Sequence, residues 1–321
     1  MAQLEACHNS GLGRHSSRAI GCYGPIVALF TRTLRQESSY IRGSMNFRGN
    51  LRRLINEVGC DFIHQLPYPH VDLFFWRPDD GTINFGDHLS IVVVDHLLRQ
   101  FGYTLADEVP RQARLFAIGS VLHYARNGDV IWGSGVNGRP GQGDLNHRVQ
   151  NLDVRAVRGP RTREVLQRRG IAVPEVFGDP ALLLPQLFPN RFRPTAKKPW
   201  VFVPNLHDLN IVDPAADTVV SPLGSWNRRI DAILEAELVL ASSLHGIIVA
   251  EAFGIPARYV RLSSGEAEFK YHDYYEGTGR FAVEFATSID EGREMGGAAR
   301  LNFDHRALMS AFPIDLWSGK N

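Results

Sequence analysis

Short apolar runs alternate along the chain with longer segments that have a helical period. From residue 71 onward, four runs are typical of buried strands: VDLFFW (71–76), RLFAIGSVL (114–122), DVIWGSGV (129–136) and LDVRAVRG (152–159). Residues 86–102 lie between the first two runs and place Leu89, Val93 and Leu97 at helical spacing. Pro160 opens a second predicted helix, which Gly170 closes. We predict that residues 173–185 form a strand that runs into a turn.

The alternation restarts after a stretch with several Pro and Lys residues at 190–199, which we interpret as a linker. Predicted helices cover 225–237 and 245–254, and the predicted strands are 200–205, 218–221, 238–243 and 258–262. Strands that alternate with helices form parallel sheets covered on both faces. The sequence therefore predicts an α/β fold with two doubly wound, Rossmann-like domains that face each other across a cleft. We expect an N-terminal domain at 48–190 and a C-terminal domain, with a C-terminal helix, at 191–321.

The first 47 residues differ from the rest of the chain. They are rich in Gly, Ser and Arg and have no sustained period, so we expect a flexible basic arm at 1–47. Residues 48–58 (RGNLRRLINEV) have the pattern of a basic amphipathic helix. This helix has two alternatives, peripheral contact with an anionic membrane surface or packing on the domain behind it.

Composition excludes several classes of protein. The 35 Lys and Arg residues balance 34 Asp and Glu residues, which gives a net charge of +1. A protein that neutralises many phosphates needs a basic excess, so we expect no nucleic-acid partner. The 3 cysteines lack metal-ligand spacing, which argues against a disulfide framework or structural zinc and favours the cytoplasm. We expect neither a metal nor a cofactor.

Candidate chemistry lies at the strand-to-helix junctions, because ligands of parallel α/β sheets bind beyond the carboxyl ends of the strands. The strongest junction is Ser242–Gly246, where backbone N–H groups, the helix dipole, Ser242, Ser243 and His245 favour an anion. Its alternative is an N-cap serine beside a packed histidine. Arg158 ends a predicted strand, where it is suited to a phosphate or carboxylate, or to pairing with an acid at the surface.

Three further segments carry polar groups. In the turn from Asn84 to His88, Asp87 is placed to cap a helix and to accept a proton from a hydroxyl nucleophile. Ser134 lies between two glycines, where a ligand can approach the backbone. We interpret residues 269–275 as a polar aromatic loop in which Lys270 holds an anion and the tyrosines stack on a sugar.

Five ordered blocks that include these junctions resemble the polysaccharide pyruvyltransferase family, and most closely its xanthan-type exopolysaccharide ketal pyruvyltransferases. The blocks are FFWRPDDGTINFGDHLS (74–90), GSVLHYARNGDVIWGSGVNG (119–138), LDVRAVRGPRTREVLQRRGIAVPEVFGDPALL (152–183), SSLHGIIVAEAFGIPA (242–257) and FKYHDYYEGTGR (269–280).

The resemblance implies transfer of pyruvate from phosphoenolpyruvate to two hydroxyls of a terminal hexose, usually the 4 and 6 hydroxyls, with release of phosphate. It implies a lipid-linked repeat unit on a polyprenyl diphosphate as acceptor, at the cytoplasmic face of the inner membrane. It also implies a fold similar to the two-domain GT-B glycosyltransferases.

The resemblance and the junctions together suggest roles for particular residues. We expect His245 to be the general acid, and Asp87 or His88 to be the general base. The expected phosphoenolpyruvate ligands are Arg158, Ser242, Ser243, Lys270 and Arg261, and the expected acceptor ligands are Asn84, Gly86, Ser134 and Tyr274. Ser243 stands where the family pattern often has arginine, which leaves Arg158, Arg261 and Lys270 as candidates for the missing phosphate ligand.

Two other functions compete with this interpretation. Residues 249–257 resemble the glutamate-containing helix of GT-B nucleotide-sugar glycosyltransferases, in which Glu251 would bind the ribose. A noncatalytic carbohydrate-binding protein is the second alternative, and it would bind glycan without depending on His245 or Arg158.

Overall fold

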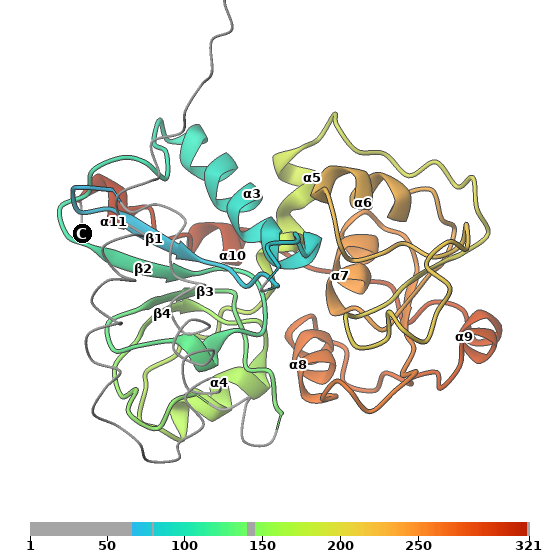
Figure 1. Cartoon of the computed structure of the whole chain (residues 1–321). Coiled ribbons are helices and arrows are strands. Elements are labelled where there is room, and N and C mark those ends of the chain that lie inside the picture. Colours follow the sequence, from blue (N-terminus) through green and yellow to red (C-terminus); the bar gives the residue numbers. More distant parts are fainter. Residues whose placement is uncertain (1–65, 79, 140–144, 320–321) are drawn as a thin grey trace, which may run out of the picture. The chain divides into compact units, whose positions relative to one another are not determined.

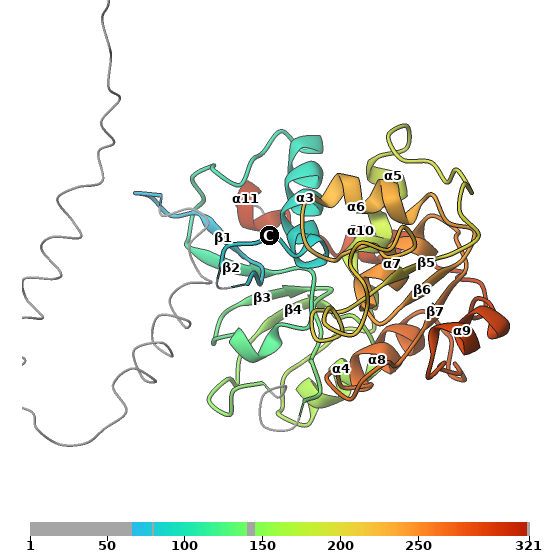
Figure 2. The same cartoon turned by 45° about the vertical axis from the view of Figure 1, so that its right-hand side comes forward.

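Two parallel β-sheets with helices packed on them make up the protein in a computed structural model that describes residues 66–78, 80–139 and 145–319 (Figures 1 and 2). The first sheet has the order β1-β2-β3-β4, and the second has the order β5-β6-β7. The strands are β1 (Val71–Phe74), β2 (Ala113–Phe116), β3 (Val130–Trp132), β4 (Asp153–Ala156), β5 (Val201–Val203), β6 (Val239–Ala241) and β7 (Ala257–Tyr259). The predicted α/β class with parallel sheets is confirmed.

All strand pairs in both sheets are parallel. In the first sheet Leu73 lies opposite Leu115, and in the second Leu240 lies between Phe202 and Arg258. Parallel strands point their carboxyl ends to one edge of a sheet, so the segments that follow the strands gather at that edge. The candidate junctions of the sequence are therefore brought to the edges where ligands bind in this fold class.

The longest described helix is α3 (Phe85–Gln100), which follows β1. Asn84 caps it by accepting a hydrogen bond from the backbone N–H of Gly86 at 3.1 Å. Leu89, Val93 and Leu97 form a buried stripe along the helix, as their spacing predicts. The helix ends beside Gly102, whose φ of +80° suits glycine.

Shorter helices follow several of the other strands. Helix α4 (Pro160–Gln167) begins at Pro160 as predicted, and α7 (Leu244–Ala252) begins directly after β6. The remaining helices are η1 (Leu122–Tyr124), η2 (Pro180–Leu183), α5 (Leu184–Leu187), α6 (Trp226–Ile233), α8 (Phe269–Gly277), α9 (Ile289–Met295), α10 (His305–Ser310) and α11 (Asp315–Ser318).

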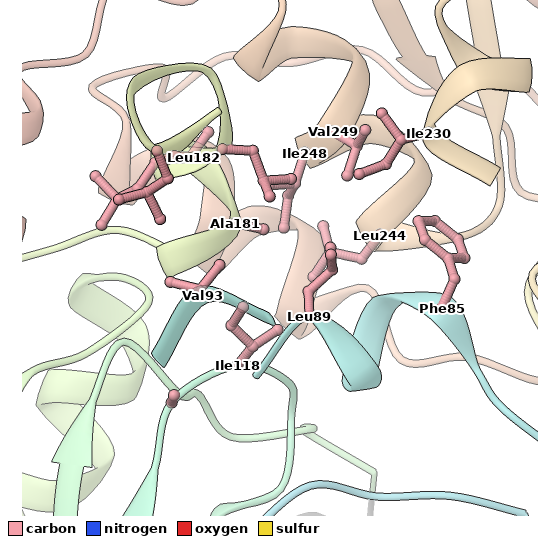
Figure 3. Packing of buried hydrophobic residues seen from close by; sticks show 14 of the residues in the cluster. Phe85, Leu89, Val93, Ile118, Ala181, Leu182, Ile230, Leu244, Ile248 and Val249 are labelled. Atoms are coloured by element: carbon pink, nitrogen blue, oxygen red, sulfur yellow. The ribbon is translucent and has the colours of Figure 1, made fainter. Parts of the chain in front are cut away.

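One hydrophobic cluster extends from the first sheet to the second. Figure 3 shows Leu89 and Val93 of α3 near Ala181 of η2 and Ile248 of α7. Each of these side chains is almost completely removed from solvent, and such burial stabilises a fold by about 25 cal/mol per Å² of apolar surface. Helices α3, η2 and α7 are therefore held together at the cavity described below.

The C-terminal helices return to the first sheet (Figure 1). The indole of Trp132 in β3 donates a hydrogen bond to the carbonyl of Leu308, and Trp317 donates one to the carbonyl of Thr104. Arg155 of β4 forms an ion pair with Asp315 at 2.7 Å. Helices α10 and α11, which lie in the predicted C-terminal domain, thus contact strands of the first sheet and the segment before β2.

Two predicted strands are much shorter in the structure. Within residues 173–185, only Phe177 forms a bridge, to Val157, and the rest becomes η2 and α5. Within residues 218–221, Val219 forms a single bridge to Phe202. Asp179 caps η2 by accepting a hydrogen bond from Ala181, so a helical turn replaces the strand at that point.

The predicted polar loop at 269–275 is in fact part of helix α8. Tyr271, Tyr274 and Tyr275 are buried on it, and the hydroxyls of the first two donate to buried acceptors, the carbonyl of Ser242 and the carboxylate of Glu251. A buried tyrosine needs such a partner for its hydroxyl. The polar sequence of this segment did not indicate a packed helix, because the acceptors of the tyrosine hydroxyls, Ser242 and Glu251, lie in other parts of the chain.

Some sequence predictions are not tested by these observations. The predicted arm at 1–47 and the predicted helix at 48–58 lie outside the described residues. The division at 190/191 and a GT-B arrangement of two domains stay predictions. None of the helices in the described ranges is long and apolar enough to cross a membrane.

Candidate functional site

A cavity of about 330 Å³ lies where segments that follow β1, β2, β3, β5, β6 and β7 meet. This volume is at the lower end of the range typical of small-molecule sites. Its wall includes the starts of two helices, two cationic side chains, two carboxylates and several aromatic rings. The cavity is therefore polar enough, and large enough, for a small charged substrate.

The starts of α3 and α7 both reach this cavity, through their capping residues Asn84 and Ser243. Ser243 caps α7 by accepting a hydrogen bond from the N–H of Gly246 at 3.3 Å. A Cβ atom at Gly86 would lie 2.1 Å from Nδ1 of His245, so only glycine permits this approach of the two helix starts. The positive ends of two helix dipoles then face one space, which favours an anion.

Two cations share one carboxylate on another part of the wall. The Lys270 ammonium lies 2.7 Å from a Glu266 oxygen, and the Arg139 guanidinium lies 3.1 Å from the other oxygen. Burial would raise the pKa of Glu266, but Lys270 and Arg139 lower it below its ordinary value. Burial also lowers the pKa of Lys270, which Glu266 opposes. Two cations against the Glu266 carboxylate leave a net positive charge facing the cavity while Asp87, the second carboxyl of the wall, is protonated.

Asp87 on α3 lies in the cavity wall in a setting that favours its protonated form. Burial raises the pKa of this carboxyl to about 7, Lys270 opposes the rise, and Asp179 and Glu266 add to it. The helix dipole at the start of α3 would favour the carboxylate, but desolvation outweighs it. Asp87 is therefore able both to donate and to accept a proton near neutral pH.

His245 shows the opposite shift at the start of α7. Burial lowers the pKa of its imidazole to about 3, and the positive charges of Lys270 and Arg158 lower it further. The imidazole is therefore neutral in the unliganded protein near pH 7, whereas a general acid needs the protonated form. Asp87 meets the requirement for a general acid better than His245 does in this state.

Arg158 lies outside the cavity wall and is fully buried. Its Nε donates to Asp273 at 3.0 Å, Nη2 donates to the carbonyl of Val136 at 2.7 Å, and Nη1 donates to the Ser120 hydroxyl. All three guanidinium nitrogens thus donate to acceptors within the protein. Arg158 therefore lies in a structural position, whereas the sequence predicted a direct contact with phosphoenolpyruvate. Ser120 does line the cavity, which puts Arg158 directly behind the wall.

Several other predicted ligands are directed elsewhere. The His88 ring packs edge-on against Phe75, and exposed Arg261 pairs with Glu268. The Ser134 hydroxyl donates to the carbonyl of Gly119, and the Ser242 hydroxyl accepts from the N–H of Asn205. These four side chains have contacts with the protein and do not line the cavity.

Tyr274 and Glu251 belong to a separate buried cluster. The Tyr274 hydroxyl donates to Glu251 at 2.6 Å, and Glu251 forms an ion pair with Arg280 at 2.6 Å. Tyr274 is therefore withdrawn from the expected acceptor site. The same pairing buries the Glu251 carboxylate inside the fold. In a glycosyltransferase this glutamate would have to bind a nucleotide ribose, and a buried, paired carboxylate is not placed for that role.

Several residues of the wall are not predicted from the sequence. Arg139 and Glu266 have been described, and Asn205, Trp76 and Tyr124 also line the cavity. Asn205 follows β5 directly, so the rule that ligands bind at the carboxyl ends of strands was the signal for it. Glu266 lies before helix α8, which begins at Phe269, so helical spacing could not indicate its ion pair with Lys270.

The wall between the first two strands is aromatic. Trp76 follows β1, and Tyr124 lies in η1 beside His123, whose ring centroid is 4.1 Å from that of Tyr124. Burial lowers the pKa of His123 to about 4, and Arg139 lowers it further, so His123 is neutral near pH 7. Flat neutral rings suit an apolar sugar face. Within the described residues, no group of three or more His, Cys, Asp or Glu side chains is arranged to hold a metal ion.

Comparison with known proteins gives one family. The sequence model of the family described as polysaccharide pyruvyl transferase matches residues 53–264. The succinoglycan biosynthesis protein ExoV of Rhizobium meliloti (strain 1021) is 30% identical over 219 residues, which cover 64% of this chain and 64% of that protein. The chain thus matches less than two thirds of the length of that relative.

One solved structure, of a functionally uncharacterized protein from Klebsiella pneumoniae, matches 76% of this chain and 100% of that chain. Its sequence identity is 13% and its TM-score is 0.44.

Proposed function

The chain belongs to the polysaccharide pyruvyl transferase family, and we propose that it transfers pyruvate from phosphoenolpyruvate to a sugar in exopolysaccharide synthesis. The observation that carries this proposal is the convergence of two helix starts, Lys270 and Arg139 on one cavity. Phosphoenolpyruvate carries a phosphate and a carboxylate on a three-carbon frame. Two anionic groups so close together need the net positive wall that this cavity offers.

The donor binds with its phosphate at the start of α7. The free N–H groups of α7 and the Ser243 cap face that position, and Lys270 lies on the same wall. Arg139 is suited to the donor carboxylate, because guanidinium groups bind carboxylates with two hydrogen bonds. Binding draws Lys270 and Arg139 partly away from Glu266, which holds them in place beforehand.

The reaction adds two hydroxyls of one sugar to the same carbon. A proton goes to the methylene carbon C3, and the first hydroxyl oxygen attacks C2 and loses its own proton. The second hydroxyl then attacks C2 as the bond to the phosphate oxygen breaks, and phosphate leaves with the second proton. Asp87 exchanges the protons in this scheme, because its raised pKa of about 7 makes both forms available.

The acceptor lies on the aromatic part of the wall. Trp76 and Tyr124 provide flat surfaces for a terminal hexose, and Asn84 and Asn137 are polar neighbours for its hydroxyls. We propose attachment at the 4 and 6 hydroxyls of a hexose in a polyprenyl-diphosphate-linked repeat unit, at the cytoplasmic face of the inner membrane. The relative's role in succinoglycan biosynthesis supports an exopolysaccharide substrate.

Binding and turnover together test this function. We expect calorimetry to detect phosphoenolpyruvate binding, and we expect phosphate release that depends on a hexose-terminated acceptor and survives EDTA. His245→Gln should lower the release rate by about 10²-fold or more, since a donor to the phosphate is lost. His305→Gln is the matched control, because His305 lies on α10 and contacts Gln186.

Two outcomes would contradict the proposal. Binding of a nucleoside diphosphate without binding of phosphoenolpyruvate would favour the glycosyltransferase alternative. Binding of glycan with no binding of either small molecule would favour the noncatalytic alternative.

A further inference from the structure

We infer that Asp179 is a positioning residue for His245, and that the two side chains form a buried carboxylate–imidazole dyad which shares one proton and charges the imidazole when an anion binds. This inference rests on the proposed function, because it assumes an anion at the start of α7. Asp179 lies behind the cavity wall, in the turn that was predicted as the end of a strand.

The geometry of the pair is the first argument. Nε2 of His245 lies 3.9 Å from Oδ2 of Asp179. Both atoms are buried, and neither has a hydrogen-bond partner among the described residues. An unmade hydrogen bond of a buried polar atom costs about 1–3 kcal/mol, so two such atoms facing each other require an explanation. A closure of about 1 Å would give a normal hydrogen bond between them.

The surroundings hold both side chains in this relation. Oδ1 of Asp179 accepts a hydrogen bond from the N–H of Ala181 at 2.9 Å, which fixes the carboxylate and leaves Oδ2 directed at the imidazole. The imidazole is confined on its other side by Gly86, close to Nδ1. Helices η2 and α7 pack on each other through Ala181 and Ile248 (Figure 3). Nδ1 therefore lies where the start of α3 meets the start of α7, beside the position proposed for the phosphate.

The charges around the pair determine where its proton lies. The positive charges of Lys270 and Arg158 act on His245, and that of Arg158 also acts on Asp179. Asp87 interacts with Asp179, and Glu266 pairs with Lys270. Burial raises the pKa of Asp179 to about 7, which the Ala181 N–H and Arg158 oppose, and burial lowers that of His245. Below about pH 7 and without an anion at Nδ1, the proton therefore resides on Oδ2 of Asp179, beside a neutral imidazole.

An anion at Nδ1 reverses this preference. The O–H bond of Asp179 breaks and an N–H bond forms at Nε2, so the carboxyl becomes a carboxylate and the imidazole becomes an imidazolium. The pair keeps its total charge, and no proton is taken from solvent. The imidazolium then donates a hydrogen bond from Nδ1 to the bound phosphate, which is the role expected of His245 at the moment the phosphate leaves.

Asp179→Asn tests the dyad with little change of shape. The amide keeps an oxygen for the Ala181 N–H and places an NH₂ group opposite Nε2, but it has no proton to transfer. The full-length chain is labelled with ¹⁵N-histidine, inorganic phosphate is the probe, and His245→Gln identifies the signals. We expect added phosphate to convert wild-type His245 to the imidazolium and to leave it neutral in Asp179→Asn.

Asp208→Asn is the matched control for this measurement. Asp208 is also buried, but it pairs with Asn205 and Ser263 and does not contact His245. The control should show the wild-type response of His245 to phosphate. In turnover, Asp179→Asn should lower kcat/KM for phosphoenolpyruvate by about 10²-fold or more and should also raise KM, because a proton shift that is driven by anion binding also strengthens anion binding.

The outcomes separate this inference from the proposed function. Phosphate bound beside a neutral wild-type His245, or an imidazolium in Asp179→Asn, would overturn the dyad alone. Failure of phosphate to bind the wild-type protein would overturn both. If Asp179→Asn does not fold, the response of the wild-type His245 to phosphate still decides the question.

Discussion

Two buried cation–carboxylate pairs support the same cavity in different ways. Arg158 pairs with Asp273 at 3.0 Å, and both side chains are completely buried. Lys270 pairs with Glu266 at 2.7 Å, and both retain about a tenth of their exposure in the cavity wall. The first pair is closed, because every nitrogen of Arg158 has an acceptor inside the fold, whereas the second pair is open to an incoming ligand.

The difference teaches that a cation near a site has one of two functions, depending on what else it contacts. A cation whose donors are all engaged by the protein holds elements together, as Arg158 holds α4 and α8 through Asp273, which also accepts from Thr162. A cation that shares one carboxylate with a second cation keeps charge available for a substrate. Stability should depend on the closed pair, and activity on the open pair.

The largest expected effect is loss of stability on breaking the closed pair. Arg158→Met leaves the Asp273 carboxylate buried without its cation, which costs about 3–5 kcal/mol in the free energy of unfolding. Urea unfolding measures this loss. Arg161→Met is the control, because Arg161 is partly exposed and its ion pair with Glu276 should contribute less than about 1 kcal/mol. Equal losses in the two variants would contradict the distinction.

The next effect is loss of activity on breaking the open pair. Lys270→Met should lower kcat/KM for phosphoenolpyruvate by about 10²–10³-fold, because one donor to the substrate charge is removed. The free energy of unfolding should change less than in Arg158→Met, since Glu266 keeps Arg139 as a partner. Lys198→Met, which breaks a pair with Asp217 distant from the cavity, should retain activity. If Lys270→Met unfolds at the same urea concentration as Arg158→Met, the open pair also contributes to stability, which would contradict the distinction.

The smallest effect is a pH dependence of stability that arises from Asp87 in the cavity wall. Asp87 has its pKa raised to about 7 in the folded protein, so between its ordinary pKa and pH 7 the folded state binds a proton that the unfolded state has released. Its contribution to stability therefore falls as the pH rises through 7. Asp87→Asn lacks this pH-dependent contribution. We therefore expect the stability of the variant, relative to wild type, to be higher at pH 8 than at pH 5.

Urea unfolding of both proteins at the two pH values measures this change. The opposite contribution of His245, whose pKa is lowered, is present in both proteins and cancels in the difference. Asp95→Asn, on the same helix but paired with Arg99 near the surface, should show the same difference from wild type at both pH values. A difference for Asp87→Asn that is constant between pH 5 and pH 8 would contradict the raised pKa.

Part of the site was predictable because its signals are local. A strand followed by Asn84 and Asp87, or by Ser243 and His245, specifies a helix start, and caps depend on residues two or three positions apart. The same holds for Pro160 at the start of α4. Local patterns of this kind predict the starts of α3 and α7, which form the two sides of the proposed anion site, without any knowledge of tertiary contacts.

The rest of the site depended on contacts between distant residues. Arg158 and Asp273 are 115 positions apart, and nothing near Arg158 in the sequence indicates that its partner is buried. The same limitation applies to Tyr274, whose hydroxyl meets Glu251 23 positions away. An arginine or tyrosine at the end of a strand or on a short polar segment has the same local pattern whether it faces a ligand or the core.

The sequence by itself therefore determined the α/β class, the parallel sheets, the helix starts of the proposed anion site, and the resemblance to the family. Only the tertiary structure decided which charges face the cavity and which face each other. It also decided that the pKa of Asp87 is raised and that of His245 is lowered. The physical reason is that a charge is stabilised or destabilised by desolvation and by its nearest partners, and both depend on chain segments that folding brings together from far apart.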